Sequence, residues 1–213
     1  CRLQGHHWVL LKSTTQRLSG AAVSFLENTM THHVILGAGP AGVIAAETIR
    51  KHAPGDTITL IGDEPDAPYS RMAIPYLLIG NIDERGTYLR KSATHLEDLR
   101  IQRVQAWVTQ VDAKAKQVML DNGQSLGFDK LLIATGSHPV RPPIPGIENA
   151  YTLRTVEDVS RIALAVANKP DRAVVIGGGF IGLESAENLI HRSIPTSIVE
   201  AQEQLIAPLD YEL

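Results

Sequence analysis

Two glycine-rich turns of the form Gly-x-Gly-x-x-Gly occur at residues 37–42 and 177–182, each between a short apolar run and a helix-like stretch. In such a turn the first glycine permits a tight bend, the second lets the backbone approach a pyrophosphate, and the third lets the helix pack closely on the strand. The helix N-terminus then offers free N–H groups and partial positive charge to the phosphates. One copy is a weak signal, but two copies in the same context predict two bound dinucleotides and electron transfer between them. The residues assigned to these sites are Gly37, Gly39, Pro40, Ala41 and Gly42 in the first turn and Gly177, Gly179, Phe180, Ile181 and Gly182 in the second.

Acidic residues follow the second strand of each unit. Asp63 and Glu64 come after the run 57–61, and Glu200 comes after the run 197–199. A dinucleotide site places an acid about 20 residues beyond the turn, where it accepts hydrogen bonds from a ribose. Such an acid favours a free 2′-hydroxyl and repels a 2′-phosphate. Because no arginine directly follows Glu200, the sequence predicts NAD(H) rather than NADP(H) at the second turn.

The elements that position these residues follow from periodicity and turn signals. We expect strands at 33–36 and 57–61 with a helix at 40–52 between them, then a polar loop at 62–71 and a short helix at 92–99. Apolar runs at 101–105, 107–111, 116–120 and 126–133 predict an antiparallel meander with a hairpin turn at 121–124, and Trp107 is expected in its core. The proline-rich segment 139–145 is a natural linker. A helix at 155–168 and a second β–α–β unit at 172–200 complete the pattern, and His138 is interpreted as a surface turn residue.

Composition excludes several function classes. The chain has 213 residues and a formal net charge of −3, so it has no basic footprint for nucleic acid. No apolar run approaches the roughly 18 residues of a membrane helix. The single cysteine, Cys1, cannot form an internal disulfide, which is compatible with a cytoplasmic location. The eight histidines form no metal-ligand set, so we expect no metal site. Residues 1–29 carry no assignable pattern and precede Met30, so we interpret them as a leader, a tag or a disordered extension.

Four motifs make the chain from Met30 onward resemble the pyridine nucleotide-disulphide oxidoreductase superfamily. They are the first turn, the segment 132–137 with Ala134, Thr135 and Gly136, the second turn with Glu184, and the segment 207–210. The resemblance implies an α/β fold, with a Rossmann-like FAD-binding domain at 30–145 that contains an antiparallel β meander. The first part of a second Rossmann-like, NAD-binding domain is expected at 146–213.

The same resemblance implies roles for several residues. In the family the first turn binds the FAD pyrophosphate, and the Ala-Thr-Gly strand closes the FAD domain beside the flavin. The second turn binds NAD, Glu184 matches an acid near the nicotinamide, and the Val108 backbone matches a strand that contacts adenine. The chain ends before the family's later Gly-Asp motif and interface domain, so we expect an incomplete NAD domain and a fragment of a longer protein.

The segment 68–76 resembles two groups of this superfamily. In NADH oxidases, peroxidases and coenzyme A-disulphide reductases a redox cysteine falls at the position of Met72, and a thioether cannot replace its thiolate. The other group passes electrons from flavin to rubredoxin, a ferredoxin, or the iron–sulphur and sirohaem part of nitrite reductase. Tyr69-Ser70-Arg71 fits that group, in which Arg71 would contact FAD phosphate or ribose.

The sequence therefore predicts an FAD-dependent NAD(P)H oxidoreductase that passes electrons from NADH through FAD to a small carrier protein or an iron–sulphur domain. Since the cofactors carry the chemistry, we assign no general base. Three alternatives stay open: a cysteine-free NADH oxidase that uses oxygen, a non-catalytic dinucleotide-binding flavoprotein that changes its assembly, and an inactive fragment. The sequence also leaves the oligomeric state and the electron acceptor open.

Overall fold

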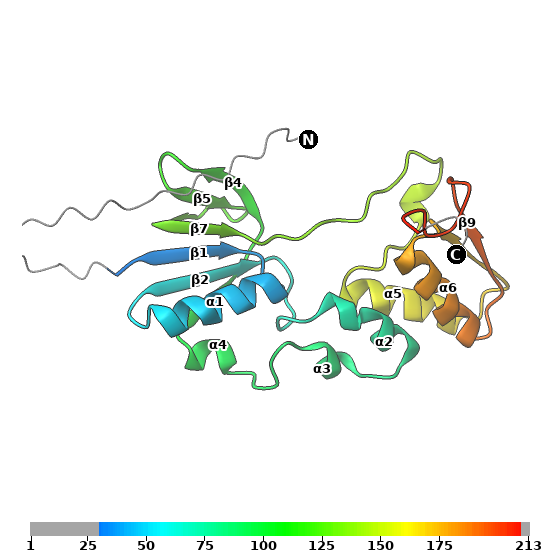
Figure 1. Ribbon diagram of the computed structural model, residues 1–213, viewed down its shortest axis with the longest axis horizontal. Helices are drawn as coiled ribbons and strands as arrows, with labels where there is room; N and C mark the ends of the chain where they lie inside the picture. Colours follow the sequence, from blue (N-terminus) through cyan, green and yellow to red (C-terminus); the bar gives the residue numbers. More distant parts are fainter. Residues whose placement is uncertain (1–29, 210–213) are drawn as a thin grey trace, which may run out of the picture.

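The computed structural model describes residues 30–209, which form two lobes (Figure 1). The first lobe is built on strands β1 to β7, and the second contains helices α5 and α6 with strands β8 and β9. Two segments join the lobes: helices α2 and α3 on one side, and the extended chain that follows β7 on the other (Figure 1). The predicted leader at 1–29 lies outside the described residues, as does the end of the 207–210 motif.

A parallel sheet in the order β3-β2-β1-β7 forms the centre of the first lobe. Its strands are β1 (His32–Leu36), β2 (Thr57–Gly62), β3 (Ile101–Gln105) and β7 (Lys130–Ile133). The helix α1 (Pro40–His52) connects β1 to β2 as predicted. All three strand pairs in this sheet are parallel.

The antiparallel meander is smaller than the sequence predicted. It contains only β4 (Val108–Asp112), β5 (Gln117–Leu120) and β6 (Ser125–Gly127). The run 101–105 pairs with β2, and the run 126–133 splits into β6 and β7, of which β7 pairs with β1. The meander interpretation of 101–133 was therefore wrong at both ends, because apolar alternation identifies a strand but not its partner. The hairpin turn at 121–124 is confirmed, with Gly123 at φ 80°.

The parallel sheet lies between the meander and the helices. On β1, Val34 and Leu36 face one side and pack with Val118 and Leu120 of β5. Ile35 faces the other side and packs with α1. Successive strand residues point to opposite faces, so both faces of this sheet must be covered. Each fully buried aliphatic side chain of this kind contributes roughly 1.5–3 kcal/mol relative to exposure.

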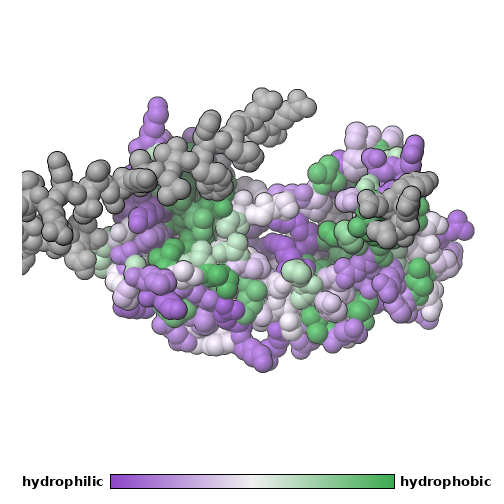
Figure 2. Space-filling view, viewed as in Figure 1, coloured by the Kyte–Doolittle hydropathy of each residue, from purple (hydrophilic) through white to green (hydrophobic). Residues whose placement is uncertain are grey.

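The second lobe follows the predicted order. Helix α5 (Val156–Ala167) begins at a capping box in which the Thr155 side chain accepts a hydrogen bond from the Asp158 N–H. Strand β8 (Ala173–Ile176), helix α6 (Phe180–His191) and strand β9 (Thr196–Val199) form the second β–α–β unit, with β8 and β9 parallel. The exposed apolar side chains on these two strands are Val174, Ile176 and Val199. Figure 2 shows apolar surface on both lobes.

Two short helices were not predicted from the sequence. They are α2 (Ile74–Ile79) and α3 (Glu84–Thr87), and α2 begins directly after a single turn of 3₁₀ helix at Arg71–Ala73. Ile74 and Leu78 of α2 pack with Val156 and Val159 of α5, together with Tyr69. Elements this short have no reliable periodicity, so tertiary packing rather than local pattern determines them. The short helix predicted at 92–99 is present as α4 (His95–Asp98). Within residues 30–209, no helix combines the length and the apolar character needed to cross a membrane.

A polar cluster attaches the segment before α4 to α1. The Glu47 carboxylate accepts bonds from Arg90 Nε at 2.8 Å and Nη2 at 2.6 Å, and it lies 2.8 Å from His95 Nε2. The hydrogen bond from Arg90 holds the pKa of Glu47 below its usual value, against the opposing effect of burial, and His95 lowers it further. A carboxyl group with a depressed pKa stabilises the fold above its unfolded-state pKa, and this contribution is lost as the pH falls through the folded-state pKa.

We expect Glu47→Gln to lower the free energy of unfolding by about 1–2 kcal/mol at pH 7, because the bidentate ion pair becomes a neutral contact. The variant should also lose less stability than the wild type between about pH 5 and pH 3. Urea unfolding at several pH values measures both effects. Glu97→Gln is the matched control, since Glu97 is exposed on α4, and an equal effect of the two substitutions would contradict the assignment.

Candidate dinucleotide-binding sites

The first turn has the backbone that a phosphate cradle requires. Gly37 adopts φ 109°, which favours glycine, and its N–H donates to the Ile61 carbonyl at 2.7 Å. A Cβ on Gly42 would overlap the carbonyl oxygen of Gly37, so helix α1 can approach the turn only with glycine there. A Cβ on Gly39 would meet no protein atom within 4 Å. Gly39 therefore faces open space, as expected where a ligand approaches the backbone.

The second turn repeats this geometry. Gly177 adopts φ 101° and its N–H donates to the Val199 carbonyl at 2.8 Å. A Cβ on Gly182 would overlap the Gly177 carbonyl oxygen, whereas a Cβ on Gly179 would again meet open space. The two turns thus share the positive φ of the first glycine, the open space at the second and the close helix approach at the third, although they lie in different lobes.

The helices behind both turns leave their N-termini free for a ligand. Gly39 and Gly179 are the N-cap residues of α1 and α6, and neither helix has a side-chain cap. First-turn N–H groups with no intrahelical partner and the positive end of the helix dipole favour an anion. Together with the open space at Gly39 and Gly179, these features fit the pyrophosphate of one dinucleotide at each turn.

The acid of the second unit is fixed beside its turn. The Glu200 carboxylate accepts hydrogen bonds from the Gly178 N–H at 2.5 Å and the Gln202 N–H at 2.7 Å. These backbone bonds, with that from Gln202 as the largest cause, hold the pKa of Glu200 below its usual value. The carboxylate is therefore ionised at neutral pH and lies beside the backbone of the second turn.

Gly178 was missed by the sequence reasoning, which gave a role only to the first, second and third glycines of the motif. A Cβ at this position would overlap Leu205 and press on Glu200. The sequence signal for this role was the extra glycine in the run Gly177-Gly178-Gly179, because the motif Gly-x-Gly-x-x-Gly does not require a glycine at position 178. In the first turn the corresponding residue is Ala38.

The acids of the two units do not occupy equivalent positions. In strand register, Leu36 pairs with Ile61 and Ile176 pairs with Val199. Glu200 therefore corresponds to Gly62, and Asp63 lies one residue further along the chain. Asp63 is exposed and lines a shallow pocket of about 360 Å³. The pocket lies at the carboxyl ends of β2 and β3, and its other lining residues are Gln105, Ala106, Trp107, Asp121 and Asn122.

Trp107 is not the core residue that the sequence predicted. Its side chain is 48% exposed and it lines the pocket that contains Asp63. The residue stands just before β4, outside the alternation of the meander, so its position in the apolar run was misleading. Val108 follows it and is partly buried against the core cluster that includes Leu36 and Val118, and its expected contact with adenine stays a prediction. His138 is exposed, as expected for a surface turn residue.

The Ala-Thr-Gly segment lies directly against the first turn. The Ala134 N–H donates to the Leu36 carbonyl at 2.7 Å, and a Cβ on Gly37 would overlap the Ala134 carbonyl. Gly136 adopts φ 70°. Thr135 lies between them and is exposed. The end of β7 and the first turn thus form one edge, with Ala134 in contact with Gly37.

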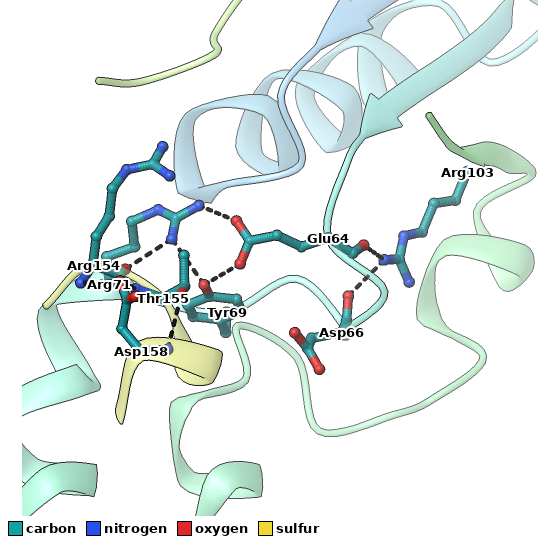
Figure 3. A network of polar contacts seen from close by, with 8 residues as sticks. All are labelled: Glu64, Asp66, Tyr69, Arg71, Arg103, Arg154, Thr155 and Asp158. Atoms are coloured by element: carbon teal, nitrogen blue, oxygen red, sulfur yellow. Dashed lines mark hydrogen bonds and ion pairs between the residues drawn. The ribbon is translucent and has the colours of Figure 1, made fainter. Parts of the chain in front are cut away.

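Glu64 and Arg71 form a polar network (Figure 3). The Glu64 carboxylate accepts hydrogen bonds from the Tyr69 hydroxyl and from Arg71. Arg71 Nη1 also donates to the Tyr69 oxygen at 2.8 Å and to the Arg154 carbonyl at 2.9 Å. Burial, reinforced by the bond to Glu64, raises the pKa of Tyr69 well above its usual value, so this phenol stays protonated.

This network joins the two lobes, because Arg154 directly precedes the capping box of α5 and Glu64 follows β2 (Figure 3). Contacts of Glu64 and Arg71 with FAD stay predictions. Arg154 was not considered from the sequence, and its Nη2 lies 3.9 Å from the Cβ position of Gly136. A lone arginine just before a helix has no sequence signal that would identify this placement.

Several predicted residues near the second turn face solvent. Phe180 and Ile181 are 65% and 66% exposed, and Glu184 is exposed one turn further along α6. Pro40 and Ala41 are likewise exposed in the first turn of α1. All four side chains at the helix starts are accessible to a ligand, and the nicotinamide contact of Glu184 stays a prediction. Met72, at the position of the family's redox cysteine, is 86% exposed.

The second and third glycines of the first motif, Gly39 and Gly42, should respond differently to alanine. Gly42→Ala should destabilise the fold by several kcal/mol or prevent folding, because its methyl group overlaps backbone. Gly39→Ala should change stability by no more than about 1 kcal/mol, because its methyl group enters open space at an ordinary φ of −78°. Thermal unfolding of both variants measures the difference, and equal destabilisation would contradict the described packing.

Comparison with known proteins supports the same interpretation. The sequence pattern of the pyridine nucleotide-disulphide oxidoreductase family matches residues 31–213. The NADH-dependent phenylglyoxylate dehydrogenase subunit epsilon of Aromatoleum evansii is 33% identical over 177 residues, which are 82% of this chain and 42% of that protein. The ferredoxin–NAD(+) reductase component of 3-phenylpropionate/cinnamic acid dioxygenase from Photorhabdus laumondii is 36% identical over 178 residues, covering 81% and 44%.

Solved structures agree with the fold. The covalent putidaredoxin reductase–putidaredoxin complex aligns with a TM-score of 0.78 at 29% identity, covering 84% of this chain and 44% of that chain. The chain spans less than half the length of the curated relatives named above. The two turns, the Ala-Thr-Gly strand and the match over residues 31–213 place this chain in the pyridine nucleotide-disulphide oxidoreductase family.

Proposed function

We propose that this chain is the FAD- and NADH-binding part of a flavoprotein reductase that delivers electrons to a small carrier protein or a redox domain. The observation that carries the proposal is the pair of equivalent turns, each with an open cradle and an acid after the adjacent strand. Two such sites in one chain suit a reaction between two dinucleotides. The family binds FAD and NAD(H), as the sequence predicted.

The chain's own residues would divide the work between the two lobes. The first turn and the uncapped N-terminus of α1 hold the FAD pyrophosphate, and Asp63 accepts hydrogen bonds from its ribose. Ala134 to Gly136 place the end of β7 beside the bound cofactor. When bound, FAD would accept a hydride and pass on its two electrons one at a time. We assign residues 30–145 to this FAD-binding part and 146–213 to the NAD-binding part.

The second turn would hold NADH by the same physical means. Glu200 is ionised and held next to Gly178 by two backbone N–H groups. A fixed negative charge there accepts hydrogen bonds from a 2′-hydroxyl and repels a 2′-phosphate, which favours NADH over NADPH. Glu184 lies one helical turn after Phe180 in α6, and we propose that it contacts the nicotinamide.

A separate electron acceptor is supported by two observations. Met72 stands where related enzymes carry a redox cysteine, and its thioether cannot accept electrons as a thiol does. The one cysteine of the given sequence is Cys1. Relatives named above act as a ferredoxin–NAD(+) reductase component and as a reductase in complex with putidaredoxin. We therefore propose an iron–sulphur carrier as the class of acceptor.

The proposal predicts a spectral change without oxygen. The purified chain, loaded with FAD and freed of unbound cofactor, should show flavin absorption bands that bleach when NADH is added, faster than a matched solution of free FAD. Bleaching would show that these residues suffice for the reaction between the two cofactors. Failure to take up FAD, or bleaching no faster than in the free solution, would contradict the proposal for this chain.

Glu200→Gln should lower the preference for NADH over NADPH by about tenfold, because the amide keeps the size of the side chain but removes the charge that repels a 2′-phosphate. Calorimetric titration of each nucleotide gives the ratio of affinities. Glu203→Gln is the matched control, since Glu203 is exposed three residues further along. Tighter binding of NADPH to the wild type would contradict the assigned role of Glu200.

A further inference from the structure

The order of strands fixes how a dinucleotide at the first turn would lie along the sheet. The phosphate cradle follows β1, and the ribose acid Asp63 follows β2. The strand beyond β2 in the sheet order is β3. Ligands of open α/β sheets bind outside the carboxyl ends of the strands. A nucleotide whose pyrophosphate lies at β1 and whose ribose lies at β2 therefore places its adenine beyond the end of β3.

The end of β3 contains a pocket of suitable character. β3 ends at Gln105, and the Ala106 N–H donates to the Gly62 carbonyl at 3.0 Å, which holds the ends of β2 and β3 together. Asp63 and Trp107 are both among the residues that line the pocket of about 360 Å³ at this point. Two of its lining side chains are the carboxylates Asp63 and Asp121, which disfavour a phosphate in the pocket. A neutral base with its sugar fits this charge pattern.

Trp107 is the one aromatic residue among those that line the pocket. Trp107 is 48% exposed although its side chain is largely apolar, so the folded chain by itself forgoes the favourable free energy of burying an indole. The remaining lining residues are polar or, like Ala106, small and buried. Only the indole among these offers a flat apolar face of the size of a purine.

The indole is presented from a fixed backbone. The Trp107 N–H donates to Asp121 Oδ1 at 3.2 Å, and the Trp107 carbonyl accepts from the Asp121 N–H at 2.9 Å. The His138 ring packs on Trp107 at 5.8 Å between centroids with a tilt of 42°. Contacts with the β5–β6 turn and with the segment after Gly136 thus hold the side chain at the pocket. A pre-positioned ring loses little entropy when a base stacks on it.

We propose that the indole of Trp107 is the stacking wall for the adenine base of the dinucleotide bound at the first turn. The inference rests on the proposed function, since it takes FAD as the occupant of that turn. It assigns to this chain a contact that the glycine motif and the acid do not provide. Stacking on an indole tolerates any purine, so hydrogen bonds elsewhere, including the proposed one to the Val108 backbone, would select adenine.

The test combines affinity with a direct optical signal. Trp107→Ala should weaken FAD binding about tenfold, and Trp107→Phe should keep it within about threefold, since a phenyl ring still stacks. In a Trp8→Phe background Trp107 is the only indole, and titration with 5′-AMP should quench its fluorescence. Ribose 5-phosphate, which lacks the base, should not. Melting temperatures of all variants establish that they are folded.

The outcomes separate the inference from the function on which it rests. Wild-type affinity for FAD in Trp107→Ala, or equal quenching by 5′-AMP and ribose 5-phosphate, would overturn the stacking role while leaving the proposed reductase intact. Equal weakening by Trp107→Ala and Trp107→Phe would likewise overturn it, because aromatic character would not matter. Absence of FAD binding by the wild type would overturn the proposed function and this inference together.

Discussion

Both sites depend on one close contact of backbone with backbone. At Gly42 and at Gly182 the following helix approaches the carbonyl oxygen of the first glycine of its turn, with no room for a side chain. This approach brings the helix N-terminus to the end of the strand, where its free N–H groups and dipole can act on an anion. If the helix stood further out, the open space at Gly39 and Gly179 would no longer lie between strand end and helix start. The remaining features of each site are arranged around this contact.

The topology of the first lobe places the segments that we propose to hold the parts of a dinucleotide at the ends of different strands. The order β3-β2-β1-β7 places the Ala-Thr-Gly segment on one side of the turn and the pocket with Asp63 and Trp107 on the other. The meander packs on one face of this sheet and α1 on the other. The Arg71 network and the apolar contacts of α2 then attach this lobe to the second one.

Local pattern was sufficient for the turns and for the elements beside them. The glycines at 37 and 177 require positive φ, and the periodicity of 40–52 and 155–168 marked two amphipathic helices, so these predictions were confirmed. Pattern was insufficient where a partner decides the structure. The run 101–105 is a strand in either sheet, α2 exists because it packs on α5, and the exposure of Trp107 depends on where β4 begins. The Glu64 carboxylate pairs with Arg71, seven residues further along the chain, because the loop between them bends back on itself.

Each turn is proposed to serve one dinucleotide of its own. Titration of Gly39→Ala and Gly179→Ala with FAD and with NADH tests this most directly, because each methyl group enters the open space of one cradle and leaves the other unchanged. We expect a crossed result, in which Gly39→Ala loses affinity for FAD alone and Gly179→Ala loses affinity for NADH alone. Loss of both ligands in either folded variant, or of neither in both, would contradict it.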